Sequence, residues 1–425
     1  MRCLFSWVLL PACHTAVAPV QIPPIETTTA PEANVERRYS FPKNLATARI
    51  IAVGDVLVHG NVKNSAKAAA RLDESGASLN HDGWSTLFEH VDTLIADADI
   101  AFANLETPVA PDHDLGSRSM VFNAPSVLLP ALNHVGFDIL SFANNHVYDQ
   151  GRPGLIETIE HLEASPLEFV GAGNTCAEAQ AYKMLEANGI HIAFLAASDI
   201  FNDNLNLEDD DPCSFELEPT AVISEAKKAR AAGADIVVLS AHWGREYRTK
   251  PEQKHIDMAH SLMEGGVDVI LGHHPHVLQP IEVYETLDGR RTITAFSLGN
   301  FISNQAYWYE FGVNKAHRGN ARDGIALQFD VVKKDYGKGP GGEPQLRTEL
   351  VDVVAVPLWT DNDAGAIRVP APTIRVVQID EELQIAHTAL ASATDADDAL
   401  ALKKRIELLE VRRWMVQSIV GDRFM

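Results

Sequence analysis

Hydrophobic positions follow two alternating patterns from about residue 48 of this chain onward. Short apolar runs rich in β-branched residues are followed by stretches in which apolar residues recur with helical period. The short runs predict strands at residues 49–53, 100–103, 139–142, 190–196, 236–240, 267–271 and 293–296. The periodic stretches predict helices at residues 84–96, 126–135, 154–164, 220–232 and 253–264. Strands that alternate with helices predict an α/β fold with a largely parallel or mixed sheet.

The pattern changes in the last quarter of the chain. Apolar runs at 325–332, 350–356 and 373–379 have no helical stretch between them, which predicts antiparallel strands that complete or cap the sheet. The segment 333–345, KKDYGKGPGGEPQ, is rich in turn residues and predicts an exposed loop. Charged residues from about Asp395 to Val420 predict one long helix. We therefore divide the chain into four parts: a leader and tether (1–44), a main domain (45–332), a loop with additional strands (333–394) and a C-terminal helix (395–425).

The N-terminal segment MRCLFSWVLLPACHTA has the pattern of an export signal. Its apolar run from Leu4 to Leu10 is too short to span a bilayer. The ending Leu-Pro-Ala-Cys resembles a bacterial lipobox, in which Cys13 is lipidated and anchors the protein to the membrane. Pro, Thr and Ala dominate the following residues and predict a flexible tether. We expect export to the bacterial cell envelope; the alternative interpretation is an upstream fragment or a misplaced start.

Composition excludes some classes of partner. The chain has 425 residues, 58 acidic and 35 basic side chains, and a formal net charge of −23 at pH 7. This balance opposes binding to nucleic acid or to an anionic membrane face. Cys176 and Cys213 are the cysteines outside the leader, and two cysteines fit either a disulfide or two buried thiols. Since no CxxC pair occurs, a thiolate zinc site is not predicted.

Polar side chains follow six of the predicted strands. They are Asp55 with His59, Asn104 with Glu106, Asn144 to His146, His242, the histidines of GHHPH at 272–276, and Asn300. In open α/β sheets, ligands bind outside the carboxyl ends of the strands. Each residue taken alone fits a turn, a helix cap or a satisfied core position. Their coincidence at six strand ends predicts one shared site.

The residue types predict a metal site. Imidazole and carboxylate groups together suit Mn, Fe or Zn, and a carboxylate can bridge two ions. Two ions about 3.5–4 Å apart can activate a water molecule and hold a phosphoryl oxygen. A further histidine nearby can donate a proton to the leaving group. No GxSxG, P-loop or dinucleotide motif is present, so nucleophilic serine chemistry, ATP and NAD are not predicted.

Several long motifs resemble a known family. GDVLVHG, ANLETPV, FNAP, GFDILSFANNHVYDQG, VGAGN, SAHWG, GHHPHVLQP and FSLGNF occur in the order seen in the CapA-type poly-γ-glutamate capsule synthesis proteins. The resemblance covers about residues 48–330. That family is similar to the calcineurin-like metallophosphoesterases, which implies a two-layer βαβ sandwich with mixed sheets around a site for two divalent ions.

The resemblance implies roles for individual residues. The implied metal ligands are Asp55, Glu106, Asn145, His242, His274 and His276, with Glu106 in the bridging position. His146 matches the proton-donating histidine, and we expect Asp149 to orient it. The phosphoesterase Asp-x-His opening is absent, so we expect His59 to replace the missing ligand. His273 is extra to the pattern and is expected to face outward. The expected substrate-binding residues are Asn104, Asn144, Arg245 and Asn300.

Two functions fit these residues. The first is a metal-dependent hydrolase acting on a phosphoester, or on an amide or ester of an acidic polymer. The second is a non-catalytic, surface-anchored factor that assists assembly or export of poly-γ-glutamate or another anionic capsule polymer. The residues favour the first function and the family resemblance favours the second.

Overall fold

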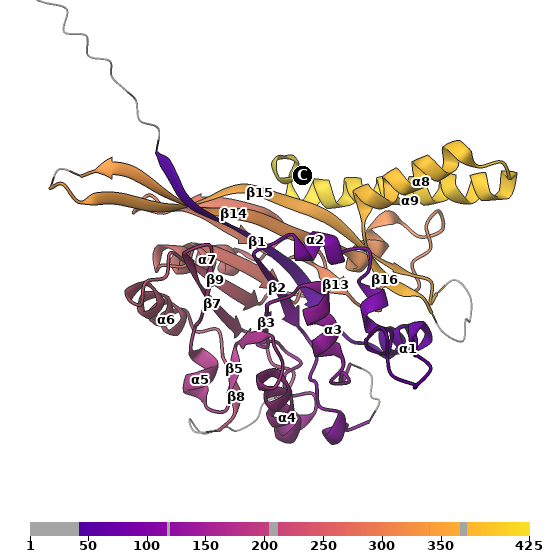
Figure 1. The fold of residues 1–425 in the computed structure, drawn as a ribbon, viewed down its shortest axis with the longest axis horizontal. Helices are drawn as coiled ribbons and strands as arrows, with labels where there is room; N and C mark the ends of the chain where they lie inside the picture. Colours follow the sequence, from indigo (N-terminus) through magenta and orange to yellow (C-terminus); the bar gives the residue numbers. More distant parts are fainter. Residues whose placement is uncertain (1–41, 117–119, 204–210, 340, 366–371) are drawn as a thin grey trace, which may run out of the picture. The chain divides into compact units, whose positions relative to one another are not determined.

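Two mixed β-sheets lie face to face at the centre of the structure (Figure 1). The computed structural model describes residues 42–116, 120–203, 211–339, 341–365 and 372–425. Of these, Pro42–Met425 belong to one compact unit. The predicted export signal, the lipidation at Cys13 and most of the tether lie outside the described residues.

The first sheet has eight strands and is built around β1 (Lys43–Val56). β1 is parallel to β2 (Ile100–Leu105), and β3 (Ile139–Ser141) and β4 (Glu168–Val170) continue the parallel order. The short β13 (Asn300–Ile302) also runs parallel to the end of β1. On its other edge β1 is antiparallel to β14 (Asp323–Lys338), which is followed by β15 (Pro344–Asn362) and β16 (Ile374–Gln378).

The second sheet has six strands in the order β11-β12-β10-β9-β7-β6. Its four central strands are parallel: β12 (Arg291–Ala295), β10 (Val269–His273), β9 (Ile236–His242) and β7 (Ile190–Ser198). The antiparallel edges are β11 (Ile281–Glu285) and β6 (Lys183–Ala187). A separate pair joins β5 (Ala172–Gly173) and β8 (Cys213–Ser214). Cys213 forms a disulfide with Cys176, which settles the choice left open by the sequence.

Side-chain alternation along the strands separates the layers. In β1, Ile50 belongs to the cluster between the sheets, whereas the next residue, Ile51, faces the helices of the first sheet. These helices are α1 (Gly60–Ala69), α2 (Asp92–Ala96), α3 (Leu128–Val135) and α4 (Gly151–Glu163). The outer face of the six-stranded sheet is covered by α5 (Cys176–Gln180), α6 (Pro219–Ala231) and α7 (Gln253–Glu264). The predicted α/β sandwich with mixed sheets is therefore confirmed, with helices outside both sheets.

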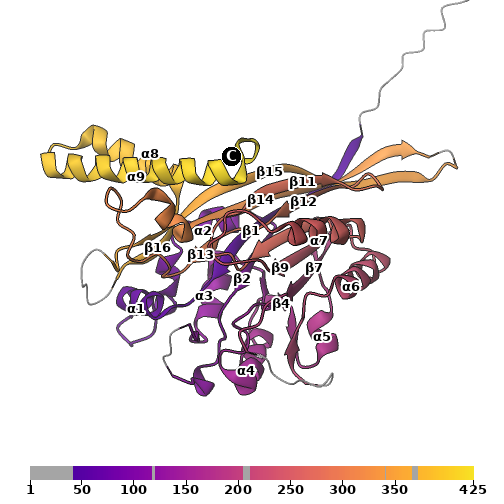
Figure 2. The same ribbon diagram turned by 180° about the vertical axis from the view of Figure 1, so that it is seen from behind.

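Two C-terminal helices run side by side and contact β15 of the first sheet (Figures 1 and 2). They are α8 (Ile379–Ser392) and α9 (Ala396–Val420), and the side chain of Asp395 caps the first turn of α9. Leu409 and Val416 of α9 share a buried cluster with Trp359 of β15. The long helix predicted from Asp395 to Val420 is thus confirmed. No helix among the described residues has the length and apolar character needed to cross a membrane.

Two predicted elements are wrong. Residues 84–96 do not form one helix: a 3₁₀ helix (His81–Leu87) and α2 are separated because Phe88 stacks on Phe301 and His90 bridges to Val377. Residues 333–345 are not a loop, because β14 and β15 extend as a hairpin almost to Gly341. Cross-strand bonds from Lys334 and Tyr336 to Glu349 stabilise this hairpin, which the turn residues alone did not reveal.

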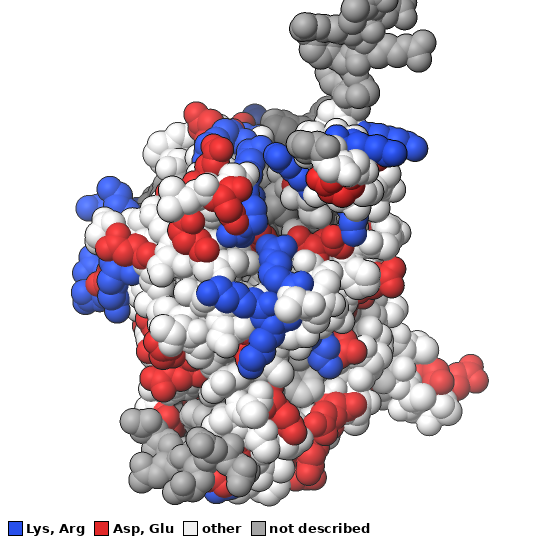
Figure 3. All heavy atoms as spheres, turned by 90° about the vertical axis from the view of Figure 1, so that its left-hand side faces the viewer, with Lys and Arg blue, Asp and Glu red and all other residues white. Residues whose placement is uncertain are grey.

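The end face beside the β14–β15 hairpin carries a band of Lys and Arg side chains (Figure 3). A groove on this side of the molecule is lined by Arg230, Arg290, Arg291 and Arg347. Asp268 forms ion pairs with both Arg230 and Arg290, so part of this positive charge is balanced locally. The groove lies where β9 and β10 begin, at the opposite end of these strands from the predicted site.

Candidate metal centre

The backbone register of the strands alone places several predicted site residues close together. Asp55 of β1 is directly paired with Asn104 of β2 and with Asn300 of β13. In the other sheet, His242 at the end of β9 is paired with His273 at the end of β10. Since parallel strands end at one edge of a sheet, the two sets of carboxyl ends meet in one place, as predicted.

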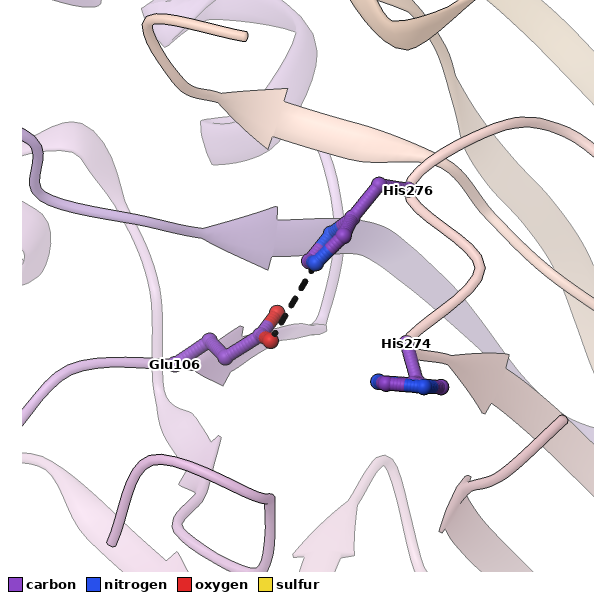
Figure 4. A group of neighbouring side chains, drawn as sticks. All are labelled: Glu106, His274 and His276. Atoms are coloured by element: carbon purple, nitrogen blue, oxygen red, sulfur yellow. Dashed lines mark ion pairs between the residues drawn. The ribbon is translucent and has the colours of Figure 1, made fainter. Parts of the chain in front are cut away.

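Five potential ligand residues form two overlapping groups. Glu106, His274 and His276 form the first group, and Asp55, Glu106 and His242 form the second. Within each group, one ligand atom per residue lies within 4.8 Å of the others. Glu106 belongs to both groups: its Oε1 is 3.6 Å from Nε2 of His276 and 3.7 Å from Nε2 of His242. In Figure 4 the Glu106 carboxylate points toward the His276 ring, and His274 lies beside them.

Unpaired polar atoms test whether these residues fit a metal ion. Both carboxylate oxygens of Glu106 are buried and make no hydrogen bond. The same holds for Nδ1 of His274 and Nε2 of His276. A buried polar atom without a partner costs about 1–3 kcal/mol, so such atoms are rare in folded proteins. A divalent cation would satisfy all of them, and histidine with carboxylate is a donor set that binds such ions. The residues therefore fit a divalent metal.

The two carboxylates of the centre are held in different electrostatic states. Burial, followed by the negative charge of Asp55, raises the pKa of Glu106 well above its usual range. Burial alone would also raise the pKa of Asp55, but hydrogen bonds from His273 and His276 outweigh it and leave that pKa well below its usual range. Burial lowers the pKa of His274 to about 4, with a further contribution from His276. At neutral pH this imidazole is uncharged, which is the form that binds metals.

Asn104 and Asn300 hold the ligands in place. Asn104 donates to Oδ1 of Asp55 at 2.9 Å, and Ser141 fixes the amide by donating to its oxygen at 2.8 Å. Oδ1 of Asn300 lies 3.0 Å from Nδ1 of His276, which leaves Nε2 of that ring directed at Glu106. We predicted substrate contacts for both asparagines; in the structure their amides bind protein groups and orient metal-ligand candidates.

The turn after β3 positions Asn145 and His146. Oδ1 of Asn145 lies 2.9 Å from Nε2 of His242, so this amide borders the second ligand group. Nδ1 of His146 is 2.8 Å from Asp149, as we expected for an orienting carboxylate. Asn144, a predicted substrate residue, is buried and shapes the turn: it donates to Leu105 and accepts from the His146 backbone N–H.

The GHHPH segment has a constrained backbone. A side chain at Gly272 would place its Cβ 2.0 Å from the carbonyl oxygen of Phe296, so only glycine fits there. His274 and His276 have φ values of 91° and 56°, a region that side chains other than glycine rarely adopt. Strained backbone is concentrated at functional sites in proteins. The strained backbone of GHHPH therefore supports a functional role for its three buried histidines.

The structure contradicts the expectation for His273 and places two further predicted residues, His59 and Arg245. The expectation that His273 faces outward is wrong, because it is fully buried and its Nδ1 lies 3.0 Å from Asp55. His59 lies outside both ligand groups, and its Nδ1 accepts a hydrogen bond from the Asn304 backbone N–H at 3.2 Å. Arg245 is exposed, with its guanidinium 3.7 Å from Glu252.

Two contacts of His146 were not found from the sequence. The Phe122 ring lies against the His146 ring, with centroids 4.5 Å apart. The amide nitrogen of Asn202 lies 3.3 Å from Nδ1 of His146, and the amide oxygen of Asn202 accepts a hydrogen bond from Asn145 at 3.2 Å. Phe122 belongs to the FNAP motif, to which the sequence analysis assigned no role. No local sequence pattern indicated Asn202.

These features define an α/β protein with a buried histidine–carboxylate centre at the carboxyl ends of two mixed sheets. Residues 49–305 match the family described as "Bacterial capsule synthesis protein PGA_cap", and the chain belongs to this family. The resemblance to CapA-type proteins is thus confirmed.

Two relatives are named as capsule or PGA biosynthesis proteins. The capsule biosynthesis protein CapA of Bacillus anthracis is 29% identical over 324 residues, which are 74% of this chain and 74% of that protein. The PGA biosynthesis protein CapA of Bacillus subtilis (strain 168) is 30% identical over 262 residues, covering 60% of this chain and 64% of that protein.

Solved structures give a weaker likeness. The calcineurin-like phosphoesterase YfkN of Bacillus subtilis is 12% identical, with a TM-score of 0.37, and the alignment covers 87% of this chain and 99% of that one. The NAD nucleotidase NadN of Haemophilus influenzae, also 12% identical, has a TM-score of 0.40 and coverage of 86% and 60%.

Proposed function

We propose that this CapA-type protein is a divalent-metal hydrolase that cleaves a phosphoester, or a related amide or ester bond of an anionic polymer, in the cell envelope. The observation that carries the proposal is the position of Glu106 in both ligand groups, surrounded by buried imidazole nitrogens without partners. A carboxylate shared between two ligand groups is suited to bridging two ions.

The residues divide into two ligand sets. Asp55, Glu106 and His242 would hold one ion, bordered by Asn145, and Glu106, His274 and His276 would hold the other. Bound Mn, Fe or Zn supplies Lewis-acid polarisation of a substrate oxygen and lowers the pKa of a water molecule. The surrounding asparagines keep the ligand side chains in position before substrate arrives.

His146 is suited to protonating the leaving group. Asp149 fixes the ring through Nδ1, which leaves Nε2 as the nitrogen available to substrate. A general acid needs this fixed orientation to deliver a proton to the leaving group. His146 is absent from both ligand groups, which separates the proton donor from the ligands.

A second candidate function is metal-dependent binding without turnover. The observation favouring it is burial: His274 is 6% exposed, and Asp55, Glu106, His242 and His276 are 0% exposed. A centre this enclosed restricts access for a long polymer. In that case the protein would assist polymer assembly or export, and export with lipid anchoring at Cys13 belongs to both candidates.

The decisive experiment measures bound metal and hydrolysis on the same samples. The purified full chain would be compared with a His274→Ala/His276→Ala variant and with His191→Ala, a control whose side chain is 49% exposed on β7. We expect stoichiometric metal and phosphodiester or polymer cleavage in the wild type and the control, and loss of both in the double variant. Metal without cleavage of any tested bond would favour the binding function. Equal metal content in all three proteins would contradict the site assignment.

A further inference from the structure

A cavity of about 640 Å³ lies beside the His276 end of the metal centre. We call it the α9 cavity, because Met415 and Ile419 of α9 form one of its walls. Tyr247 after β9 and residues 306–321 after β13 contribute to the others. Most of the lining lies beyond the end of the family match at residue 305. Membership of the family therefore assigns no role to most of this cavity.

Direct contacts join the α9 cavity to the metal centre. The Tyr247 backbone N–H donates to the carbonyl of Pro275 at 2.8 Å, and the Tyr247 ring centroid is 6.3 Å from that of His276. Asn300, which orients His276, also donates to the carbonyl of Ala321 in the cavity wall at 2.8 Å. A ligand in the α9 cavity would therefore lie next to the ligand group that contains His276.

Apolar side chains form most of the lining of the α9 cavity. They include Val277, Trp308, Met415 and Ile419, together with the ring of Tyr247. The unbranched thioether of Met415 can adapt its shape to a flexible hydrocarbon chain. Burial against such a surface stabilises the apolar part of a ligand, whereas a small polar molecule gains little from it. The cavity therefore suits a ligand that has a hydrocarbon portion.

Apolar surface continues from the α9 cavity to solvent. Tyr247 and Trp308 line the cavity and are nevertheless 53% and 46% exposed. Tyr307 and Val313, in the same segment as Trp308, are 47% and 70% exposed. Exposed apolar side chains gathered in one region mark a binding site. A hydrocarbon chain longer than the cavity would thus remain in contact with apolar surface.

The charged groups of the lining are basic. The chain has 58 acidic and 35 basic residues, yet Arg318 and His317 line the α9 cavity, and none of the described lining residues is Asp or Glu. Arg318 is exposed and forms no ion pair with a carboxylate of the described residues. By contrast, the cavity between α2 and α8 is lined by Asp92, Asp97 and Glu381. The α9 cavity therefore combines apolar walls with groups that attract an anion.

The wall formed by α9 is fixed in position. The buried guanidinium of Arg412 pairs with Asp323 and donates to the carbonyl of Ala316 at 2.6 Å. Ala316 begins the 3₁₀ helix η3 (Ala316–Arg322), which carries Arg318. Because one side chain joins both walls, the cavity is organised before a ligand binds, which reduces the entropy lost on binding.

We propose that the α9 cavity holds the hydrocarbon tail of an amphiphilic phosphoester, a phosphate esterified to a long-chain alcohol, and places its phosphoryl group at the metal centre. Trp308, Met415 and Ile419 contact the tail, and Arg318 attracts the anionic headgroup. The inference rests on the proposed function for the chemistry of the neighbouring centre and adds the substrate class. Among the bonds considered for that function, it selects the phosphoester of a lipid.

Hydrolysis of such a ligand needs water as its only co-reactant. The water oxygen forms a bond to phosphorus, and the bond between phosphorus and the alcohol oxygen breaks. His146 gives a proton to the departing alcohol oxygen, and a proton released from the attacking water restores the ring. The products are inorganic phosphate and the free long-chain alcohol, so the tail loses its charged end in the reaction.

Titration calorimetry on the full chain with added Mn²⁺ tests the tail site. The probe is dodecylphosphonate, whose carbon–phosphorus bond resists hydrolysis, at concentrations below those at which it forms micelles. Methylphosphonate carries the same headgroup without the tail. We expect dodecylphosphonate to bind at least about tenfold more tightly, because only this ligand buries hydrocarbon in the cavity. Equal affinities for the two phosphonates would overturn the inference.

Variants of the lining locate the tail. Trp308→Ala and the double variant Met415→Gln/Ile419→Gln are expected to lower the affinity for dodecylphosphonate at least about tenfold and to leave that for methylphosphonate unchanged. Trp414→Ala is the matched control, because it removes an α9 tryptophan that is 63% exposed and lies outside the lining. The control should bind both ligands like the wild type. Wild-type affinity for dodecylphosphonate in the α9 double variant would contradict the inference, even where Trp308→Ala fails to fold.

Kinetics separate this inference from the proposed function. We expect a kcat/KM for dodecyl phosphate at least about tenfold above that for methyl phosphate, and Trp308→Ala should remove this preference. Cleavage of both esters with equal kcat/KM would overturn the inference and leave the proposed hydrolase standing. Tail-dependent binding of the phosphonate without cleavage of either ester would support the tail site and contradict the proposed hydrolase.

Discussion

Among single residues, His146 has surroundings that define its role most closely. Asp149 holds Nδ1, the Phe122 ring packs against the His146 ring in a T-shaped contact, and Asn202 lies between the ring and Asn145. The residue is buried yet belongs to neither ligand group. This arrangement fixes a ring beside a metal centre without using it as a ligand, which suits proton transfer.

Replacement of His146 by Ala is expected to lower kcat by about 10²- to 10⁴-fold, the usual contribution of a positioned general acid, while metal content stays unchanged. Asp149→Asn should lower kcat less, because the ring remains but loses its orienting charge. The check is steady-state kinetics alongside elemental analysis of each variant. Loss of metal from His146→Ala would show that the residue is a ligand.

Asp323 gives a pH dependence that can be isolated. Burial raises its pKa from 3.8 to about 6, although Arg412 opposes the shift. Between these pH values the folded protein binds a proton at Asp323 that the unfolded chain does not bind. The stability contribution is therefore present below pH 3.8 and is lost as pH rises through 6, with a size of about 3 kcal/mol.

The measurement is the free energy of unfolding in urea, taken across this pH range for the wild type and Asp323→Asn. We expect the advantage of the wild type over the variant to grow as pH falls from neutral toward the ordinary aspartate pKa. Parallel curves for the two proteins would exclude Asp323 as the titrating group.

Residue positions could be predicted only where strand position determines them. The proximity of Asp55, Glu106, His242 and His276 was predictable because each lies at or just beyond the end of a strand whose end meets the others. Sequence position does not show which amide faces which carboxylate, so Asn104 and Asn300 were assigned to substrate. His273 was misjudged because strand register places it opposite His242, inside the centre.

Among the elements, α9 is held by one buried charged side chain in addition to its buried apolar residues. Arg412 is 0% exposed and pairs with Asp323, and its guanidinium lies over the Trp359 ring at 5.1 Å. The charged stretch from Asp395 to Val420 predicted this helix, but the partner of Arg412 lies 89 residues away in the sequence. Helical period shows which face is buried and does not show against what. Local sequence also does not show which strands pair, so residues 333–345 of the β14–β15 hairpin were predicted to form a loop.

Replacement of Arg412 by Met is expected to destabilise the protein by about 3–5 kcal/mol, because Asp323 would be left buried and unpaired. The double variant Arg412→Met/Asp323→Leu should recover much of this loss, since well-packed apolar groups often replace buried ion pairs without cost. Urea unfolding of the two variants and the wild type provides the comparison. Equal destabilisation in the single and double variants would contradict this account.

In the whole molecule, the metal centre is a junction between the two sheets. Asp55 in β1 and Glu106 after β2 belong to the eight-stranded side, whereas His242 in β9 and the two histidines after β10, His274 and His276, belong to the six-stranded side. An ion bound by both sets would therefore join the two halves of the sandwich. Global stability should then depend on metal, even though the hydrophobic clusters lie elsewhere.

Addition of Mn²⁺ at about 100 times its Kd is expected to stabilise the folded protein by about 2.7 kcal/mol and to raise Tm. Chelation should reverse the gain, and His242→Ala should remove most of it because the variant loses one half of the junction. Thermal unfolding followed by circular dichroism measures this effect. A Tm that is insensitive to metal in the wild type would show that the ions do not link the sheets.

The position of β1 also determines when the chain can fold during its synthesis. Ile50 pairs with Ile100 on one side and with Phe329 on the other. One neighbour of β1 is therefore synthesised almost 280 residues after β1 itself. Contacts this distant in sequence slow folding and leave sheet edges open to aggregation. A nascent chain that has emerged only as far as residue 322 would leave Lys43–Ala52, the part of β1 that pairs with β14, along a free edge. We therefore expect its metal ligands to assemble only after β14 has left the ribosome.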